Sequence, residues 1–365
     1  MKVVLLHDWL TGVRGGERVL EVFCEMFPEA PIYTLVYKKG SCTPLIENRK
    51  IKASFLNKIP QIDKHYRKFL PLFPLAASSL NIVEDCDLVL SSSHCVIKGV
   101  KKPKSSKHLS YIHSPMRYIY DQFENYFGKD APPLQRLGAK FCRPYLQKWD
   151  MASNNNVDHM IANSAFVQKR IKEFYHLESS IVHPFVDLKD FYEVQMNPPP
   201  KENFYLMVTA FAPNKKVGLA IEAFNELGFN LKIVGGGQQE RELKALAKPN
   251  IEFLGNVSRE DVVLLMSKAK AFIFPGVEDF GITPLEALAS GTPVIARKIG
   301  GVLETLNDHV AQFFIEDEKS ALINAVHDFN NKNFLRENLL SRAQDFSKEM
   351  FKQKIQVEIN NLCKN

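Results

Sequence analysis

The sequence predicts an α/β protein with two domains, each built on a parallel sheet that helices cover on both faces. The chain has 365 residues, which is more than one hydrophobic core usually organises. Short apolar segments typical of buried strands alternate with helical patterns along nearly all of it. A Pro-rich stretch at residues 184–203 interrupts this alternation near the middle. We interpret that stretch as a linker between the domains.

The first half alternates apolar strand patterns with amphipathic helix patterns. The predicted strands are residues 3–6, 32–36, 87–91, 108–112 and 159–162, and the predicted helices are residues 16–27, 65–80, 133–152 and 165–174. The first apolar run is too short for a signal peptide, and no stretch approaches the roughly 18 apolar residues of a membrane span. We therefore expect a cytoplasmic protein.

The second half repeats the alternation. Its predicted strands are residues 204–209, 231–234, 251–254, 271–274 and 294–296, and its predicted helices are residues 217–227, 239–247 and 259–267, with one more that starts near residue 283. From about residue 330 the pattern is helical without strands.

The composition is that of an ordinary globular protein, with 45% hydrophobic and 24% charged residues. Its six cysteines include no Cys-x-x-Cys pair, which argues against a zinc knuckle or a redox dithiol. Residues 1–185 carry 26 Lys and Arg against 17 Asp and Glu, whereas residues 186–365 carry 21 against 24. This asymmetry predicts that the first half faces something anionic, the alternative being an ordinary charged surface.

The most informative segment is residues 278–286, which follows a predicted buried strand. Thr283 is the predicted N-cap of a helix, and Glu286, three residues on, completes a capping box. Free N–H groups at a helix start favour a phosphate. We expect the backbone of this loop and helix start to bind one, through Phe280, Gly281, Ile282 and Thr283.

Two carboxylates, Glu278 and Glu286, flank this predicted phosphate site. They are compatible with it if they accept hydrogen bonds from the hydroxyls of a sugar and a ribose on either side of the phosphates. The segment resembles the Glu-x7-Glu motif of retaining glycosyltransferases of family 4, which have the two-lobed GT-B fold. The resemblance implies that Glu278 lies against the donor sugar and Glu286 against the ribose. The alternative is a solvated loop carboxylate and a helix cap.

A glycine pair, Gly15-Gly16, follows the first predicted strand and opens a helix. Such a turn lets the backbone approach a phosphate closely, although a mere tight turn would look the same. No Gly-Lys-Ser/Thr follows, so it is not a P-loop. The segment from His7 to Arg18 resembles the N-terminus of family members that are mannosyltransferases of bacterial surface polysaccharides.

Lys215 and Lys216 come just after the first strand of the second domain. A lysine there can neutralise a pyrophosphate and stabilise it as a leaving group, which is the role that the resemblance implies for Lys215. The family motif has an Arg about five residues earlier, where this chain has Ala210. We expect Lys216 or Arg14 to substitute for it.

Three more residues enter through the resemblance. Residues 111–117 are similar to the His-x-Pro segment of the family, which implies that His113 hydrogen-bonds the sugar, whereas a lone His is more often structural. Asn163 matches a polar position beside the cleft, and Asn256 lies where relatives contact the base. The turn Gly235-x-Gly237 is not a dinucleotide fingerprint, because the third glycine position is Glu240.

Together these features indicate a GT-B enzyme with domains at residues 1–190 and 200–345 and a C-terminal helix at 346–365 that crosses back to the first domain. The expected donor is a nucleotide sugar, GDP-mannose by resemblance, with UDP and other donors open, and the acceptor is a saccharide or a lipid-linked sugar. No cofactor or metal is expected, since no Asp-x-Asp pair follows a strand. No nucleic-acid-binding module is recognisable. The alternative from another class is a non-catalytic two-lobed sugar-binding protein.

Basic residues interleaved with apolar ones predict a peripheral contact with an anionic membrane at its cytoplasmic face. The residues are Lys58, Lys64, His65, Arg67 and Lys68 beside Phe55, Leu56, Phe69, Leu70, Leu72 and Phe73, with a second basic run at residues 98–107. The alternative is that the apolar side chains belong to the core.

Overall fold

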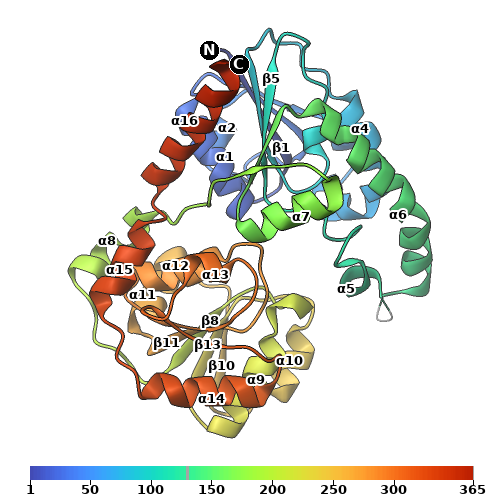
Figure 1. The fold of residues 1–365 in the computed structure, drawn as a ribbon. Helices are drawn as coiled ribbons and strands as arrows, with labels where there is room; N and C mark the ends of the chain where they lie inside the picture. The colour runs from blue at the N-terminus through green and yellow to red at the C-terminus, as the bar shows by residue number, and fades with distance from the viewer. Residues whose placement is uncertain (129–130, 365) are drawn as a thin grey trace. The chain divides into compact units, whose positions relative to one another are not determined.

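The computed structural model describes residues 1–128 and 131–364 and divides into two compact units (Figure 1). The first unit comprises Met1–His183 with the chain from Lys352 onward, and the second comprises Pro184–Phe351. Each unit contains one parallel sheet. The predicted class, α/β with two Rossmann-like domains, is therefore confirmed.

The sheet of the first unit has the order β3-β2-β1-β4-β5-β6-β7. Its strands are β1 (Val3–Leu10), β2 (Ile32–Tyr37), β3 (Ile51–Ala53), β4 (Leu88–Ser93), β5 (Lys107–Ile112), β6 (His159–Ala162) and β7 (Ser180–Ile181). The edge strands β3 and β7 escaped sequence prediction because they are short and only half-buried, so that they lack a long apolar run.

Helices cover both faces of this sheet. They are α1 (Gly15–Met26), α2 (Pro44–Glu47), α3 (Ile62–His65), α4 (Phe73–Ser79), α5 (Phe123–Phe127), α6 (Pro133–Ser153) and α7 (Ala165–Tyr175). Figure 1 shows α1 and the C-terminal helix α16 (Lys348–Lys364) on one side of the sheet and α4 and α6 together on the other. An ion pair of 2.6 Å between Lys352 Nζ and Glu25 Oε2 holds α16 against α1.

The sheet of the second unit has the order β10-β9-β8-β11-β12-β13. Its strands are β8 (Tyr205–Val208), β9 (Leu231–Val234), β10 (Ile251–Gly255), β11 (Ala271–Phe274), β12 (Val294–Arg297) and β13 (Ala311–Phe314). Its helices are α8 (Tyr192–Met196), α9 (Val217–Leu227), α10 (Glu240–Leu246), α11 (Arg259–Lys268), α12 (Ile282–Ala289), α13 (Val302–Thr305), α14 (Lys319–Asn330) and α15 (Arg336–Gln344). Separate hydrophobic clusters line the two faces of the sheet.

Two sequence expectations require correction. The helix expected at residues 65–80 is broken into α3, the 3₁₀ helix η2 (Tyr66–Leu72) and α4, with non-helical backbone at Phe69. Pro71 explains the break, because proline lacks an N–H and clashes with the preceding turn. The expected linker at 184–203 is also largely structured, since Phe191 lies in the core of the second unit. None of the described helices is both long and apolar enough to cross a membrane.

Candidate functional site

Each sheet has one point at which the strand order reverses. In the second unit this point lies between β8 and β11, and in the first unit it lies between β1 and β4. Ligands of open parallel sheets bind beyond the carboxyl ends of the strands at such switch points, because the connections there leave towards opposite faces. The residues predicted from the sequence gather at these two places, which are described one unit at a time.

In the second unit, Lys215 and Glu278 meet at the switch point. Lys215 ends the 3₁₀ helix η6 (Pro213–Lys215) after β8, and Glu278 lies in the loop after β11. The two loops touch, since Val277 N donates to Asn214 O at 3.1 Å. Lys215 Nζ and Glu278 Oε1 form an ion pair in which each side chain is about one-fifth exposed. An ammonium group has three N–H donors, so Lys215 can hold this carboxylate and bind a second anion.

The glycine pair Gly300-Gly301, which sequence analysis did not single out, packs against the backbone of Glu278. Gly301 N donates to Glu278 O at 3.0 Å, and a Cβ on Gly301 would lie 2.3 Å from Asp279 O. Gly300 adopts φ +78°, a backbone conformation that favours glycine. Because a side chain at either position would displace the loop, the glycine pair after β12 fixes its path. Two adjacent glycines after a buried strand are the sequence feature that could have revealed this.

The predicted capping box at α12 is wrong. The helix starts at Ile282, and its N-cap is Gly281 with φ +86°, without a side-chain cap. Gly281 can adopt this left-handed conformation, so the chain turns into the helix two residues earlier than expected. Thr283 is thus already helical, and Pro284 lies in the first turn. The Phe280 side chain is part of the core of the second unit.

Glu286 forms an ion pair with Arg259, a residue that sequence analysis missed. Arg259 Nη2 lies 2.8 Å from Glu286 Oε1, and its Nε lies 3.0 Å from Asp190 Oδ2. Burial lowers the pKa of Arg259, but the two carboxylates raise it more, so the guanidinium stays charged. Arg259 starts α11 and thereby holds Glu286 beside the loop between β10 and α11, where Asn256 is exposed. An arginine at a helix start gives no sequence pattern that would reveal this role.

Lys216 is already paired. Its Nζ lies 2.7 Å from Asp317 Oδ2, and Arg297 Nη1 lies 3.1 Å from the same oxygen. Burial raises the pKa of Asp317, but these two cations lower it more, so the carboxylate stays ionised. The expectation that Lys216 or Arg14 replaces the missing Arg at the exposed Ala210 stays a prediction.

In the first unit, the predicted residues Gly16, His113 and Asn163 come together at the switch point. Gly15 and Gly16 open α1, and a Cβ on Gly16 would lie 3.7 Å from His113 Nε2. Asn163 Nδ2 donates to His113 O at 3.0 Å. Asn163 thus fixes the backbone of His113, whose ring packs beside the start of α1.

A chain of polar contacts continues from His113 into the core. Its Nε2 lies 2.8 Å from Ser92 Oγ, and Ser92 Oγ lies 3.1 Å from His7 Nδ1. His7 Nε2 in turn lies 3.8 Å from Glu17 Oε1. Burial lowers the pKa of His113 well below its usual value, so this ring stays neutral. Sequence analysis did not single out Ser92. It is one of the serines that follow the hydrophobic residues of β4, and nothing in that pattern marks it as functional.

Glu17 is ionised within this cluster. Burial raises the pKa of Glu17, but the interactions with the adjacent His7 ring and a backbone hydrogen bond together outweigh burial, and the pKa falls to about 2. Glu17 Oε2 also accepts a hydrogen bond of 3.0 Å from Arg14 N. The carboxylate therefore ties the Gly15-Gly16 turn to the end of β1.

Asp8 has a structural role in the first unit. Its Oδ2 accepts from His94 N and Cys95 N, and its Oδ1 accepts from Val96 N and Ile97 N, at 2.7 to 2.9 Å. Four backbone donors satisfy the carboxylate, which holds the loop after β4 in place.

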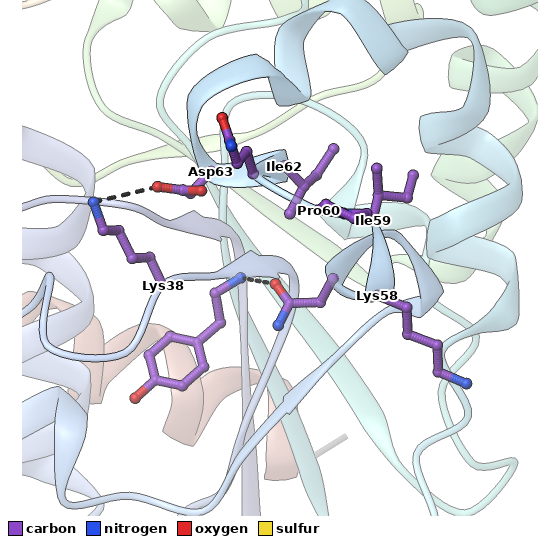
Figure 2. A pocket seen from close by; sticks show the side chains of 9 residues that line it. Lys38, Lys58, Ile59, Pro60, Ile62 and Asp63 are labelled. Atoms are coloured by element: carbon purple, nitrogen blue, oxygen red, sulfur yellow. Dashed lines mark hydrogen bonds and ion pairs between the residues drawn. The ribbon is translucent and has the colours of Figure 1, made fainter.

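A shallow pocket of about 350 Å³ lies elsewhere in the first unit, beyond the end of β2 (Figure 2). Lys38 Nζ pairs with Asp63 Oδ2 at 3.2 Å, and Tyr37 N donates to Asn57 Oδ1 at 2.8 Å. These contacts satisfy its main polar groups, and none of the predicted site residues lines it. Among the described residues, no group of three or more His, Cys, Asp or Glu side chains is placed to hold a metal ion.

Comparison with known proteins shows that this chain is similar to glycosyltransferases. Residues 189–346 match the family model "Glycosyl transferases group 1". The chain is 25% identical to an uncharacterized glycosyltransferase of Methanocaldococcus jannaschii over 96% of this chain and 94% of that protein. It is also 31% identical to the O-antigen chain mannosyltransferase RfbU of Salmonella typhimurium. That match covers 47% of this chain and 54% of RfbU, so the chain spans about half the length of this relative.

Among solved structures, the chain is similar to sucrose-phosphate synthase of Thermosynechococcus elongatus, with a TM-score of 0.75 and 18% identity over 99% of both chains. At this identity the likeness concerns the fold alone. Together with the two parallel sheets it confirms the predicted GT-B fold.

Proposed function

We propose that this chain, which carries a glycosyl transferases group 1 domain and has the GT-B fold, is a retaining glycosyltransferase that uses a nucleotide diphosphate sugar. The observation that carries the proposal is the Lys215–Glu278 ion pair at the switch point of the second unit. It places a cation for a phosphate and a carboxylate for sugar hydroxyls side by side, at the carboxyl ends of β8 and β11.

In this proposal the nucleotide binds to the second unit. Glu286, held by Arg259, accepts hydrogen bonds from the ribose hydroxyls, and the exposed loop at Asn256 lies beside the base. The backbone N–H groups at the start of α12 face the diphosphate. Lys215 neutralises the charge that grows on the diphosphate as the bond to the sugar breaks.

Glu278 binds the donor sugar and orients its anomeric carbon, while the acceptor hydroxyl attacks from the side that the diphosphate leaves. The proton of that hydroxyl passes to the departing diphosphate. In the first unit, Gly15, Gly16 and His113 can donate hydrogen bonds to a phosphate or a sugar hydroxyl, since His113 is neutral and contacts Ser92 through Nε2, not Nδ1. No metal ion is required, because lysine and helix N–H groups supply the positive charge.

The proposed donor is GDP-mannose, with a UDP-sugar as the alternative. The likeness to an O-antigen mannosyltransferase supports mannose as the sugar and a saccharide, free or lipid-linked, as the acceptor. Such an enzyme would act in the cytoplasm, at the inner face of the plasma membrane.

Thermal stabilisation by a panel of nucleotide sugars tests the proposal. A ligand at 100 times its Kd adds about 2.7 kcal/mol, which raises the melting temperature measurably. We expect GDP-mannose and GDP to stabilise the wild type, and GDP to stabilise Glu278→Gln as well. The proposal fails if no nucleotide or nucleotide sugar stabilises the wild type.

A further inference from the structure

Helix α6 (Pro133–Ser153) presents an unusual apolar stripe to solvent. Leu134 is 84% exposed, Leu137 55%, Phe141 78% and Tyr145 49%. At 100° per residue these side chains fall within an arc of about 80°, and the stripe is about 17 Å long. Single exposed apolar residues are normal on a soluble protein, but four in one line on one helix form a continuous surface.

The opposite side of α6 explains why this stripe stays outside. Leu146 and Asp150 are buried, and Asp150 Oδ1 forms an ion pair of 2.8 Å with the buried Lys98. Tyr120 Oη donates to Asp150 Oδ2 at 3.0 Å. These contacts fix the rotation of the helix about its axis, so the stripe cannot turn inward to join the core.

The charged residues of α6 indicate what kind of partner the stripe binds. Residues 131–149 contain Arg136, Lys140, Arg143 and Lys148 and no Asp or Glu. Arg143 is held against the core, where its Nε donates to Ile119 O at 2.9 Å. Arg136, Lys140 and Lys148 are exposed, and none of them has an ion-pair partner among the described residues. At 100° per residue Lys148 falls within the arc of the stripe and Lys140 about 60° from its edge, whereas Arg136 falls on the far side of the helix. A helix with an apolar line beside unpaired cations such as Lys140 and Lys148 is typical of one that lies flat on an anionic lipid surface.

We infer that the outer face of α6 docks the first unit onto an anionic lipid bilayer. The apolar stripe enters the boundary between headgroups and acyl chains, and the cations face lipid phosphates. Tyr145 suits this depth, because its ring is apolar and its hydroxyl reaches water. The inference concerns binding alone and does not depend on the proposed sugar transfer.

This surface corrects part of the membrane contact predicted from the sequence. Leu56 and Phe73 belong to the core of the first unit, and Lys98 is buried in its ion pair with Asp150. The side chains of Lys58, Lys64, His65, Arg67 and Lys68 are exposed. Phe55 and Leu72 are exposed as well, whereas Phe69 and Leu70 are only partly so. Because η2 packs against α4 and α4 packs against α6, these basic residues add positive charge in the same part of the unit (Figure 1).

Sedimentation of the full chain with vesicles tests the inference. We expect binding to phosphatidylcholine vesicles that contain phosphatidylglycerol and none to phosphatidylcholine alone. Leu134→Ser combined with Phe141→Ser should weaken binding about tenfold or more. The matched control, Leu246→Ser combined with Ile315→Ser, removes two exposed apolar side chains from the second unit and should bind as the wild type does.

Charge is tested with a second matched pair. Lys140→Gln combined with Lys148→Gln should weaken binding by about fivefold per cation, and more at low salt. Lys101→Gln combined with Lys104→Gln, in the other basic run, should have little effect. As a positive readout, the fluorescence of Phe141→Trp should shift to shorter wavelength with anionic vesicles, in excess of any shift of the wild type.

Three outcomes would overturn the inference. One is a wild type that stays in the supernatant with anionic vesicles at low salt. Another is undiminished binding by the Leu134 and Phe141 variant. The third is self-association of the wild type that this variant abolishes, which would identify a second copy as the partner of the stripe. Donor hydrolysis in solution should be the same in the variant and the wild type, so this test and that of the proposed function fail independently.

Discussion

Lys215 Nζ is ion-paired with Glu278 Oε1, and this contact joins the loop after β8 to the loop after β11. The two residues are 63 positions apart in the sequence and meet because β8 and β11 are neighbours in the sheet. Gly276 permits the approach, since a Cβ there would lie 2.6 Å from Asn214 O. The pair therefore follows from the strand order and one glycine.

Glu278→Gln should lower turnover by about two orders of magnitude, the cost of losing one well-placed polar group in a water-excluded site. The nucleotide affinity should change little, because the nucleotide binds through other residues. Steady-state kinetics with calorimetry of GDP binding measures both. Glu316→Gln, an exposed carboxylate of the same unit, is the control. An equal loss of affinity and turnover would show that Glu278 does not act on the sugar.

Lys215→Ala should lower kcat by about 100-fold or more, whereas Lys216→Ala should keep it within a few fold. In the proposal Lys215 contacts the diphosphate, while Lys216 is neutralised by Asp317. The two neighbouring variants are each other's control in the same kinetic assay. Similar losses would mean that the phosphate lies between the two lysines.

Glu286→Ala should weaken nucleotide binding by about tenfold, since it removes a charged acceptor from the ribose. Arg259→Ala should have a smaller effect of the same kind, because it only loosens Glu286. Both variants should lose under about 1 kcal/mol of stability, because the ion pair is partly exposed and Glu286 is not part of a helix cap. Calorimetry measures the nucleotide affinity of each variant, and thermal melting measures its stability. Unchanged affinity for Glu286→Ala would remove that residue from the nucleotide site.

Glu17 should make the first unit sensitive to acid. The folded-state pKa of about 2 lies below the ordinary value of 4.5, so Glu17 stabilises the fold above pH 4.5, and this contribution is lost as the pH falls towards 2. Its size is on the order of 3 kcal/mol. Melting temperatures should therefore fall less steeply over this range for Glu17→Gln than for the wild type. The exposed Glu29→Gln should behave as the wild type, and parallel curves for Glu17→Gln would refute the assignment.

Activity should survive removal of divalent metal ions, because Lys215 and the start of α12 supply the positive charge at the diphosphate. Initial rates in EDTA should match those in buffer with Mg²⁺. Rates that collapse in EDTA and return with Mg²⁺ or Mn²⁺ would contradict this.

The sequence predicted most of the fold, because the strands that position the site are apolar runs with clear ends. Strands β9 and β11 and helix α9 have the predicted bounds. The prediction from local propensity was wrong at α12, because Thr283 is a good N-cap residue but is not the N-cap of this helix. The left-handed conformation of Gly281, which only the packed loop reveals, moved the start of the helix.

The site residues were predicted as separate motifs, but their partners were not. Arg259, Ser92 and Asp317 act through tertiary contacts with Glu286, His113 and Lys216, and no local pattern encodes such pairs. The α6 stripe escaped notice for a related reason. Leu134 and Phe141 fit a helix pattern equally well whether that face is buried or exposed, and only the buried ion pair of Asp150 settles which way it points.

The central claim is transfer from a nucleotide sugar with retention, and slow hydrolysis of the donor tests it most directly. The wild type incubated with GDP-mannose should release GDP, and NMR of the freshly released mannose should show the α-anomer of the donor. Lys215→Ala and Glu278→Gln should each lower that rate by about 100-fold, with folding intact. Release at equal rates by the wild type and both variants, or initial release of the β-anomer, would contradict the account.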